Sequence, residues 1–249
     1  MSGIKSTLGL SNSIVKENGF FGINNSNQIM VENQNFINYH QLMEMEKQER
    51  VNFVNSLGGF KSVCLIGTKN KNEQLNLAVF SSIMHIGANP PLMGVIFRPG
   101  VVERHTLENI IETEFFTINH LNETIFKQAH QTSARYDRTI SEFEVSSLTP
   151  EYKNDFLAPY VNESHIQLGM QFKQRIDLEI NNTILVIAEI KQVYFPADCQ
   201  CKDGFLDIEK ANTITCSGLD SYHKTVRLDR LSYAKPDKEL TSIPIHYIE

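Results

Sequence analysis

Short apolar runs alternate with polar, turn-forming residues through the middle and later parts of the chain. Runs of this length, bounded by turn residues, are typical of buried β-strands. Two of the breaks, residues 69–72 and Asn181-Asn182, predict hairpin turns, the second because asparagine tolerates positive φ. The last run is longer than an ordinary strand of about five to six residues, so we expect a β-bulge in it. The predicted strands are residues 63–67, 75–81, 92–97, 115–119, 176–180 and 183–195.

Helical patterns fall between and before these strands. Apolar side chains recur at spacings of three and four over residues 102–114, which predicts a helix there. A shorter helix is predicted over residues 122–130, with Asn122 as its N-cap and an acidic first turn. Strong helix formers predict another helix near residues 39–50, and residues 131–160 are interpreted as loops with one helix. Strand hairpins with helices at their loops predict a mainly β fold, a closed barrel with peripheral helices.

The 249 residues fit one barrel domain with additions at both ends. Residues 1–50 are rich in Asn, Gln and Ser and carry the pair Phe20-Phe21, so we expect an irregular extension with a short strand or two. This extension is a candidate arm or lid. The barrel domain is predicted over residues 51–235, and residues 236–249 are interpreted as a C-terminal tail.

Composition narrows the class of protein. A formal net charge of -6 argues against a broad nucleic-acid-binding surface. No apolar run approaches the ~20 residues that cross a bilayer, and no apolar signal-peptide core follows the N-terminus. Four cysteines are too few for a disulfide scaffold and favour a reducing, cytoplasmic setting. The Cys-x-Cys pair among them lacks the second ligand pair of common zinc motifs, so no metal is expected. The cysteines are Cys64, Cys199, Cys201 and Cys216.

Small polar side chains and cations concentrate at predicted strand ends between residues 61 and 120. Hydroxyls, backbone N–H groups and arginine are the groups that a phosphate binds. Strand ends and adjacent loops gather in space in a barrel, so these side chains are expected to share one site for a polar, anionic ligand. They are Thr68, Asn76, Ser81, Ser82, Arg98, Arg104, His105 and Thr106.

The order of these residues resembles the FMN-binding split-barrel flavoproteins, the flavin reductase-like family. The resemblance covers about residues 55–225, its later part more weakly, and implies a split β-barrel. Its elements are Thr68, Asn76-Leu77-Ala78 with Ser81, Pro90-Pro91, Arg104, Thr106 with Asn109, and Phe116 with Asn119. The chain departs from the family pattern at Met84-His85, after the serine pair, and in its long N-terminal extension.

Roles for individual residues follow from this resemblance. The segment Asn76-Leu77-Ala78 is implied to line the flavin and its ribityl chain, near Thr68. The serine end and the Arg/Thr loop are implied to hold the phosphate, with Arg104 preferred to Arg98 because it lies close to Thr106. His223 is a candidate contact for the flavin ring or the nicotinamide. No catalytic side chain is named, because hydride transfer depends mainly on stacking and on charge near the ring. The phosphate-binding candidates are Ser81, Ser82, Arg98, Arg104, His105 and Thr106.

Three functions stay open on the sequence alone. The first is an oxidoreductase that moves hydride from NAD(P)H to FMN and passes electrons to a second flavin, a partner protein or a small acceptor. The resemblance implies a homodimer for it. The second is a non-catalytic FMN electron carrier or flavin-binding module without an NAD(P)H site, and the third is a split barrel without flavin. Serine-hydrolase, Rossmann and P-loop motifs are absent from the sequence, which disfavours those classes.

Overall fold

The computed structural model describes residues 34–98 and 104–248. The chain divides into two compact units, Met1–Arg50 and Val51–Glu249. Where one helix was predicted near residues 39–50, the structure has two, α1 (Tyr39–Glu44) and α2 (Lys47–Ser56). The chain is extended at Met45, with ψ at 144°. The Arg50 guanidinium donates to the carbonyl oxygens of Met43, at 2.7 Å, and Met45, at 3.0 Å, which the break leaves without helical partners.

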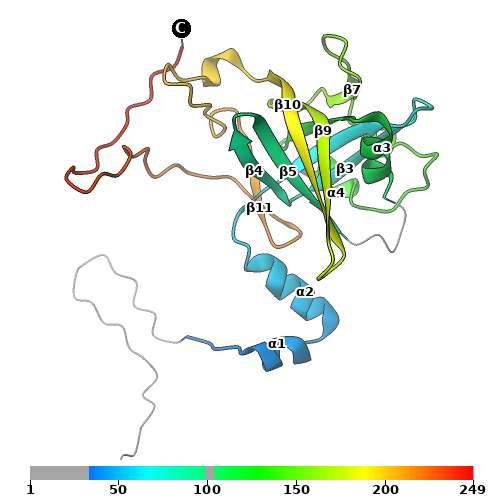
Figure 1. Cartoon of the computed structure of the whole chain (residues 1–249), viewed down its shortest axis with the longest axis horizontal. Helices are drawn as coiled ribbons and strands as arrows, with labels where there is room; N and C mark the ends of the chain where they lie inside the picture. Colours follow the sequence, from blue (N-terminus) through cyan, green and yellow to red (C-terminus); the bar gives the residue numbers. More distant parts are fainter. Residues whose placement is uncertain (1–33, 99–103, 249) are drawn as a thin grey trace, which may run out of the picture. The chain divides into compact units, whose positions relative to one another are not determined.

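The second unit is built on one seven-stranded antiparallel sheet with the order β3-β2-β6-β9-β10-β5-β4 (Figure 1). Its two edge strands, β3 and β4, follow each other directly in the chain. The rings of Phe80 on β3 and Phe97 on β5 meet edge to face at 4.9 Å, so the sheet curls until its two sides approach each other. The strands are β2 (Cys64–Lys69), β3 (Leu75–Phe80), β4 (Ile83–Ala88), β5 (Pro91–Phe97), β6 (Phe115–His120), β9 (Gln167–Leu178) and β10 (Thr183–Tyr194).

Two small sheets and a few short helices complete this unit. One sheet joins β1 (Lys61–Ser62), β11 (Thr215–Ser217) and β12 (Ser221–His223), and the other pairs β7 (Pro150–Glu151) with β8 (Tyr160–Val161). The helices are α3 (His105–Thr113), α4 (Phe126–Gln131), α5 (Glu142–Ser146) and the 3₁₀ turn η1 (Ala197–Cys199). No helix in the described part of the chain is long and apolar enough to span a membrane.

Two apolar cores lie on opposite faces of β2 and β3. The inner core fills the barrel and is covered by α3, whose Leu107 and Ile110 are buried against it. The outer core packs α4 and α5 against the other face, with Leu77 and Phe143 buried in it. Alternation along β3 therefore decides which of its residues face the barrel and which face α5.

The last segment of the chain runs back along residues 199–210. Arg227 forms an ion pair with the buried carboxylate of Asp207, and the Tyr247 hydroxyl donates to the same carboxylate at 2.9 Å. Arg230 pairs with Asp203 at 2.6 Å. Arg227 and Arg230 precede the predicted tail, residues 236–249, and Tyr247 fastens that tail near its C-terminal end.

The predicted mainly β architecture is confirmed, but the barrel is not closed as expected, because β3 and β4 are edge strands that do not pair with each other. Individual elements also differ from the prediction. The structure adds β4, which no predicted strand covered, and β9 begins at Gln167, nine residues before the predicted start. Helix α4 begins at Phe126, and Asn122 is not its N-cap, because the Asn122 side chain accepts from the Thr124 N–H in a turn. The bulge expected in residues 183–195 is present, because Lys191 of β10 has no partner on β9, and a second register break leaves Lys173 of β9 without a partner on β10. Asn182 adopts φ 57° in the hairpin turn. Residues 102–103 of one predicted helix and the strands predicted near the N-terminus lie outside the described residues.

Candidate functional site

Four buried amide and hydroxyl side chains tie α3 to the first hairpin of the barrel. Thr68 on β2 lies opposite Asn76 on β3. The Asn76 amide donates to the hydroxyl of Thr106 at 2.9 Å and to that of Thr68 at 3.3 Å. The Asn109 amide donates to Thr68 at 3.1 Å, while its own carbonyl oxygen is buried and accepts no hydrogen bond from the described residues. This amide–hydroxyl cluster brings together three predicted residues, Thr68, Asn76 and Thr106, and one that the motif contained, Asn109.

The predicted segment Asn76-Leu77-Ala78 presents its side chains to both faces of the sheet. Asn76 points inward to the amide–hydroxyl cluster, and Ala78, two residues on, shares that inner face. The Leu77 side chain is fully buried in the outer core, so only its backbone remains for a ligand or a neighbouring side chain. The Leu77 N–H donates to Glu142 Oε2 at 3.0 Å.

The serine pair lies at the other end of β3. Five residues separate Asn76 from Ser81, which corresponds to about 17 Å along a strand. Half-buried Ser81 lies beside the thiol of Cys216, whose pKa is raised by burial, and the carbonyl oxygen of exposed Ser82 accepts from the Ile96 N–H at 3.0 Å. The predicted residues are therefore spread along β3 rather than gathered at one end of it.

Cations gather where β5 ends and α3 begins. Arg98 follows β5 and is exposed, and Arg104 is the N-cap residue of α3 and half-buried. Burial, followed by the like charges of Arg135 and Arg98, lowers the pKa of Arg104. These three residues form the arginine cluster, and the helix N-terminus adds its own positive potential. Such an arrangement suits an anion.

Two carboxylates lie on the other side of this region, facing His105. Hydrogen bonds from the backbone N–H and the hydroxyl of Thr139 are the main causes that lower the pKa of Asp137, and the electrostatic interaction with His105 adds to them. Burial raises the pKa of Glu142, while the Leu77 N–H and His105 act in the opposite direction. His105, the first residue of α3, thus lies near acidic side chains, whereas its neighbour Arg104 lies near cationic ones.

Arg135 and Glu142 belong to this region but were not among the predicted residues. Both come from the polar segment that follows α4, where no periodic pattern marks a ligand site. Only the tertiary fold brings this segment against β3 and α3, so the sequence carried no local signal for either residue.

His223 lies on β12, and its ring is held by other groups. Its Nε2 atom is 2.9 Å from the Ser217 hydroxyl and 3.1 Å from that of Ser221. The ring also meets Phe60 edge to face at 4.9 Å. The neighbouring strand β11 carries Cys216, the partner of Ser81, so the structure places His223 on the sheet that borders the serine end of β3.

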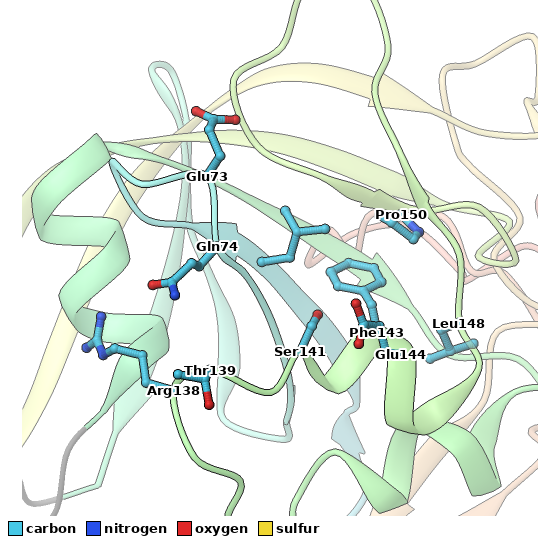
Figure 2. A pocket seen from close by; sticks show the side chains of 10 residues that line it. Glu73, Gln74, Arg138, Thr139, Ser141, Phe143, Glu144, Leu148 and Pro150 are labelled. Atoms are coloured by element: carbon cyan, nitrogen blue, oxygen red, sulfur yellow. The ribbon is translucent and has the colours of Figure 1, made fainter.

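A pocket of about 340 Å³ opens beside the first residues of β3 (Figure 2). The polar side chains of Gln74 and Arg138 stand opposite the apolar ones of Phe143 and Leu148, and Ser141 lies beside Phe143. None of the predicted cofactor residues lines this pocket, and Arg138 is paired with Glu108. The pocket lies on the α5 side of β3 and is distinct from the arginine cluster.

The cysteines show no metal-site geometry. Residues 34–98 and 104–248 contain no group of three or more His, Cys, Asp or Glu side chains placed to hold an ion. All four thiols are free and buried. Burial, with a smaller contribution from Cys216, raises the pKa of Cys64 to about 12, so this thiol is protonated at neutral pH.

Comparison with known families decides the class of the protein. The flavin reductase like domain model matches residues 60–205, which is more than half of the chain. The chain belongs to the flavin reductase-like family. The matched range includes the first hairpin, the serine pair, the arginine cluster and α5, and ends before β11 and β12.

Solved members of similar fold confirm the split barrel. A protein from Shewanella frigidimarina NCIMB 400, assigned as a flavin reductase with split barrel domain, is 47% identical, with a TM-score of 0.78, over 81% of this chain and 100% of that one. Nitrilotriacetate monooxygenase component B from Bacillus cereus is 22% identical, with a TM-score of 0.69, over 78% of this chain and 97% of that one, and supports the fold alone. The opening between β3 and β4 is the split of this flavin reductase-like barrel.

A curated relative covers less of the chain. An uncharacterized protein from Aquifex aeolicus (strain VF5) is 28% identical over 103 residues, which are 41% of this chain. The match spans about half, 53%, of that relative's length.

Proposed function

We propose that this flavin reductase-like protein binds FMN along β3 and transfers electrons from NAD(P)H through it to an acceptor. The observation that carries the proposal is the arginine cluster at the start of α3, in which burial, followed by the like charges of Arg135 and Arg98, lowers the pKa of Arg104. Like charges are costly to hold together without an anion between them. A phosphate with close to two negative charges would relieve that repulsion and accept hydrogen bonds from the guanidinium groups.

The described residues suit different parts of FMN. Arg98, Arg104 and Arg135 would hold the phosphate with the α3 N-terminus. The amide–hydroxyl cluster fixes α3 on the hairpin and offers the unpartnered carbonyl oxygen of Asn109 to a ribityl hydroxyl. Bound flavin supplies the hydride chemistry, and this chain orients it.

His105 and the acids that face it balance the charge beside the arginine cluster. Asp137 and Glu142 both interact with His105, so the positive potential is concentrated on the three arginines. His223, held by two serine hydroxyls, presents a fixed ring at the serine end of β3. We assign it to the binding of the flavin ring or the nicotinamide, and no side chain is assigned to proton transfer.

A homodimer in the cytoplasm completes the proposal. Met84 and Ile86 on edge strand β4 are 40% and 41% exposed, an apolar surface that a second copy could cover. The acceptor is a second flavin, a partner protein or a small molecule.

The decisive experiment is an anaerobic visible spectrum of the purified protein with FMN, followed by NADH and then NADPH. We expect flavin absorbance that stays with the protein on gel filtration and bleaches with one of the two donors. Bound flavin that neither donor bleaches would replace the reductase by an electron carrier. A protein that retains no flavin would refute the proposed cofactor.

A further inference from the structure

On the outward edge of β3, the middle of the proposed flavin segment has one hydrogen-bond partner among the described residues. The Asn70 N–H donates to the Gln74 carbonyl oxygen at 3.1 Å, which fixes the hairpin ladder. Every second residue of β3 from there faces β2, so the Leu77 amide points away from the sheet. β3 is an edge strand of its sheet, so no further strand receives that N–H.

The partner is the Glu142 carboxylate, which reaches the edge from α5. Phe143, the next residue, is 2% exposed in the outer core and fixes the helix beside the strand. The Ser146 hydroxyl donates to the Glu142 carbonyl oxygen at 2.5 Å. The side chain of Glu142 is itself buried, with 7% of the residue exposed, and its Oε2 lies 3.0 Å from the Leu77 nitrogen.

A buried carboxylate is a costly acceptor for backbone N–H groups. Water would satisfy an exposed edge amide at little cost, whereas burial penalises a charged carboxylate. The groups that face this carboxylate are the Leu77 N–H from β3, the backbone N–H of Glu142 itself and His105 from α3. Both belong to elements of the proposed flavin site, since Leu77 lies between Asn76 and Ala78.

We propose that Glu142 is a positioning residue that holds the Asn76–Ala78 backbone in the orientation that binds flavin. This inference rests on the proposed function of the same site. The bond to Leu77 fixes the twist of an edge strand that would otherwise be restrained from one side only. Asn76 is thereby kept toward Thr106, and Ala78 toward the inner face of the strand.

The charge of the Glu142 carboxylate makes it possible to distinguish a positioning role from a contribution to the stability of the fold. Because burial raises the pKa of Glu142, its ionised form is less favourable in the folded chain than in the unfolded one. The stability that goes with the raised pKa is present at low pH and lost as pH rises through the folded pKa. A neutral side chain of the same shape should therefore leave melting temperature at pH 7.5 unchanged or higher, while still accepting from Leu77.

The test compares Glu142→Ala with Glu142→Gln in the full-length protein without ligand and with FMN. Amide exchange followed by NMR should show Leu77 exchanging about tenfold faster in the alanine variant and at its original rate in the glutamine variant. The FMN dissociation constant should rise about tenfold in the first and less than about threefold in the second. Glu144→Ala is the matched control, because Glu144 lies on the same helix but is exposed at the pocket (Figure 2).

Each outcome has a distinct meaning. Unchanged Leu77 exchange in the alanine variant would overturn the positioning role, and so would equal loss of FMN in both Glu142 variants, which would point to charge rather than to the acceptor. A wild-type protein that binds no FMN would refute the proposed function instead. The exchange of Leu77 would still show whether Glu142 fixes the strand edge.

Discussion

Arg104→Ala tests the arginine cluster most directly. Arg104 is half-buried, and Arg98 and Arg135 lie close enough to lower its pKa. A charge-assisted hydrogen bond to phosphate contributes about 1.5–3 kcal/mol. Two arginines remain in the variant and the site is partly in water, so the low end of that range applies. We expect a loss of about 1.5–2 kcal/mol, or roughly 10- to 30-fold weaker binding of FMN.

Riboflavin, which lacks the phosphate, provides the comparison within the same assay. Quenching of flavin fluorescence on titration gives both dissociation constants, and riboflavin binding should change less than about threefold. Added salt should weaken FMN binding to the wild type more than riboflavin binding, because exposed charges are screened. Arg175→Ala is the control for net charge, since Arg175 on β9 is exposed and paired with Asp177 at 2.6 Å. Equal loss of both ligands in Arg104→Ala would refute a phosphate contact and indicate a role in holding α3.

Three further substitutions test the fold itself. Phe97→Ala removes a buried ring that packs against Phe80 in the inner core, and should lower the free energy of unfolding by about 3–5 kcal/mol in urea titration; a loss below about 1 kcal/mol would contradict the barrel closure described. Gly67→Ala would place a Cβ 2.3 Å from the backbone oxygen of Pro159, so we expect a clear drop in melting temperature, and an unchanged value would show that β8 can move away. His120 has a pKa lowered by burial to about 4, so the unfolded chain takes up its proton first and stability should fall by about 2–3 kcal/mol as pH drops from 6.5 to 4. The variant His120→Gln should remove that part of the pH dependence. A pH profile of stability identical to that of the wild type would rule out His120 as its cause.

The strands that the sequence predicted are those with an unbroken apolar pattern. β4 was not predicted because its register shifts between His85 and Gly87, and three of its side chains are exposed large residues. The first half of β9 was missed because Gly169 interrupts it. A Cβ there would lie 2.4 Å from the Tyr160 hydroxyl, so the glycine serves close packing that no local pattern reveals. The irregularities in β4 and β9 are local departures from the apolar pattern, and tertiary contacts require these departures.

The candidate site was partly predictable for a similar reason. Thr68 and Asn76 meet because a hairpin pairs them, and hairpin pairing can be inferred from the sequence. Ser81 was expected beside them, but a strand carries its two ends apart, and the structure places it against Cys216 instead. Glu142 reaches β3 from a helix 65 positions away in the chain, a contact that depends on how α5 packs.

The order of the strands has a consequence for how the barrel opens. β3 and β4 are adjacent in the chain but occupy the two edges of the sheet, so no strand-to-strand ladder joins these two strands. In the described part of the chain, the Ser81-Ser82 connection and packed side chains such as Phe80 and Phe97 bridge this seam. Ladder hydrogen bonds join all the remaining pairs of neighbouring strands in that sheet. Local opening should therefore cost the least free energy at the seam. A ligand held at this seam would contact the first and last strands together. The free energy of binding would then stabilise the closed seam, so that ligand binding and closure of the barrel are thermodynamically linked.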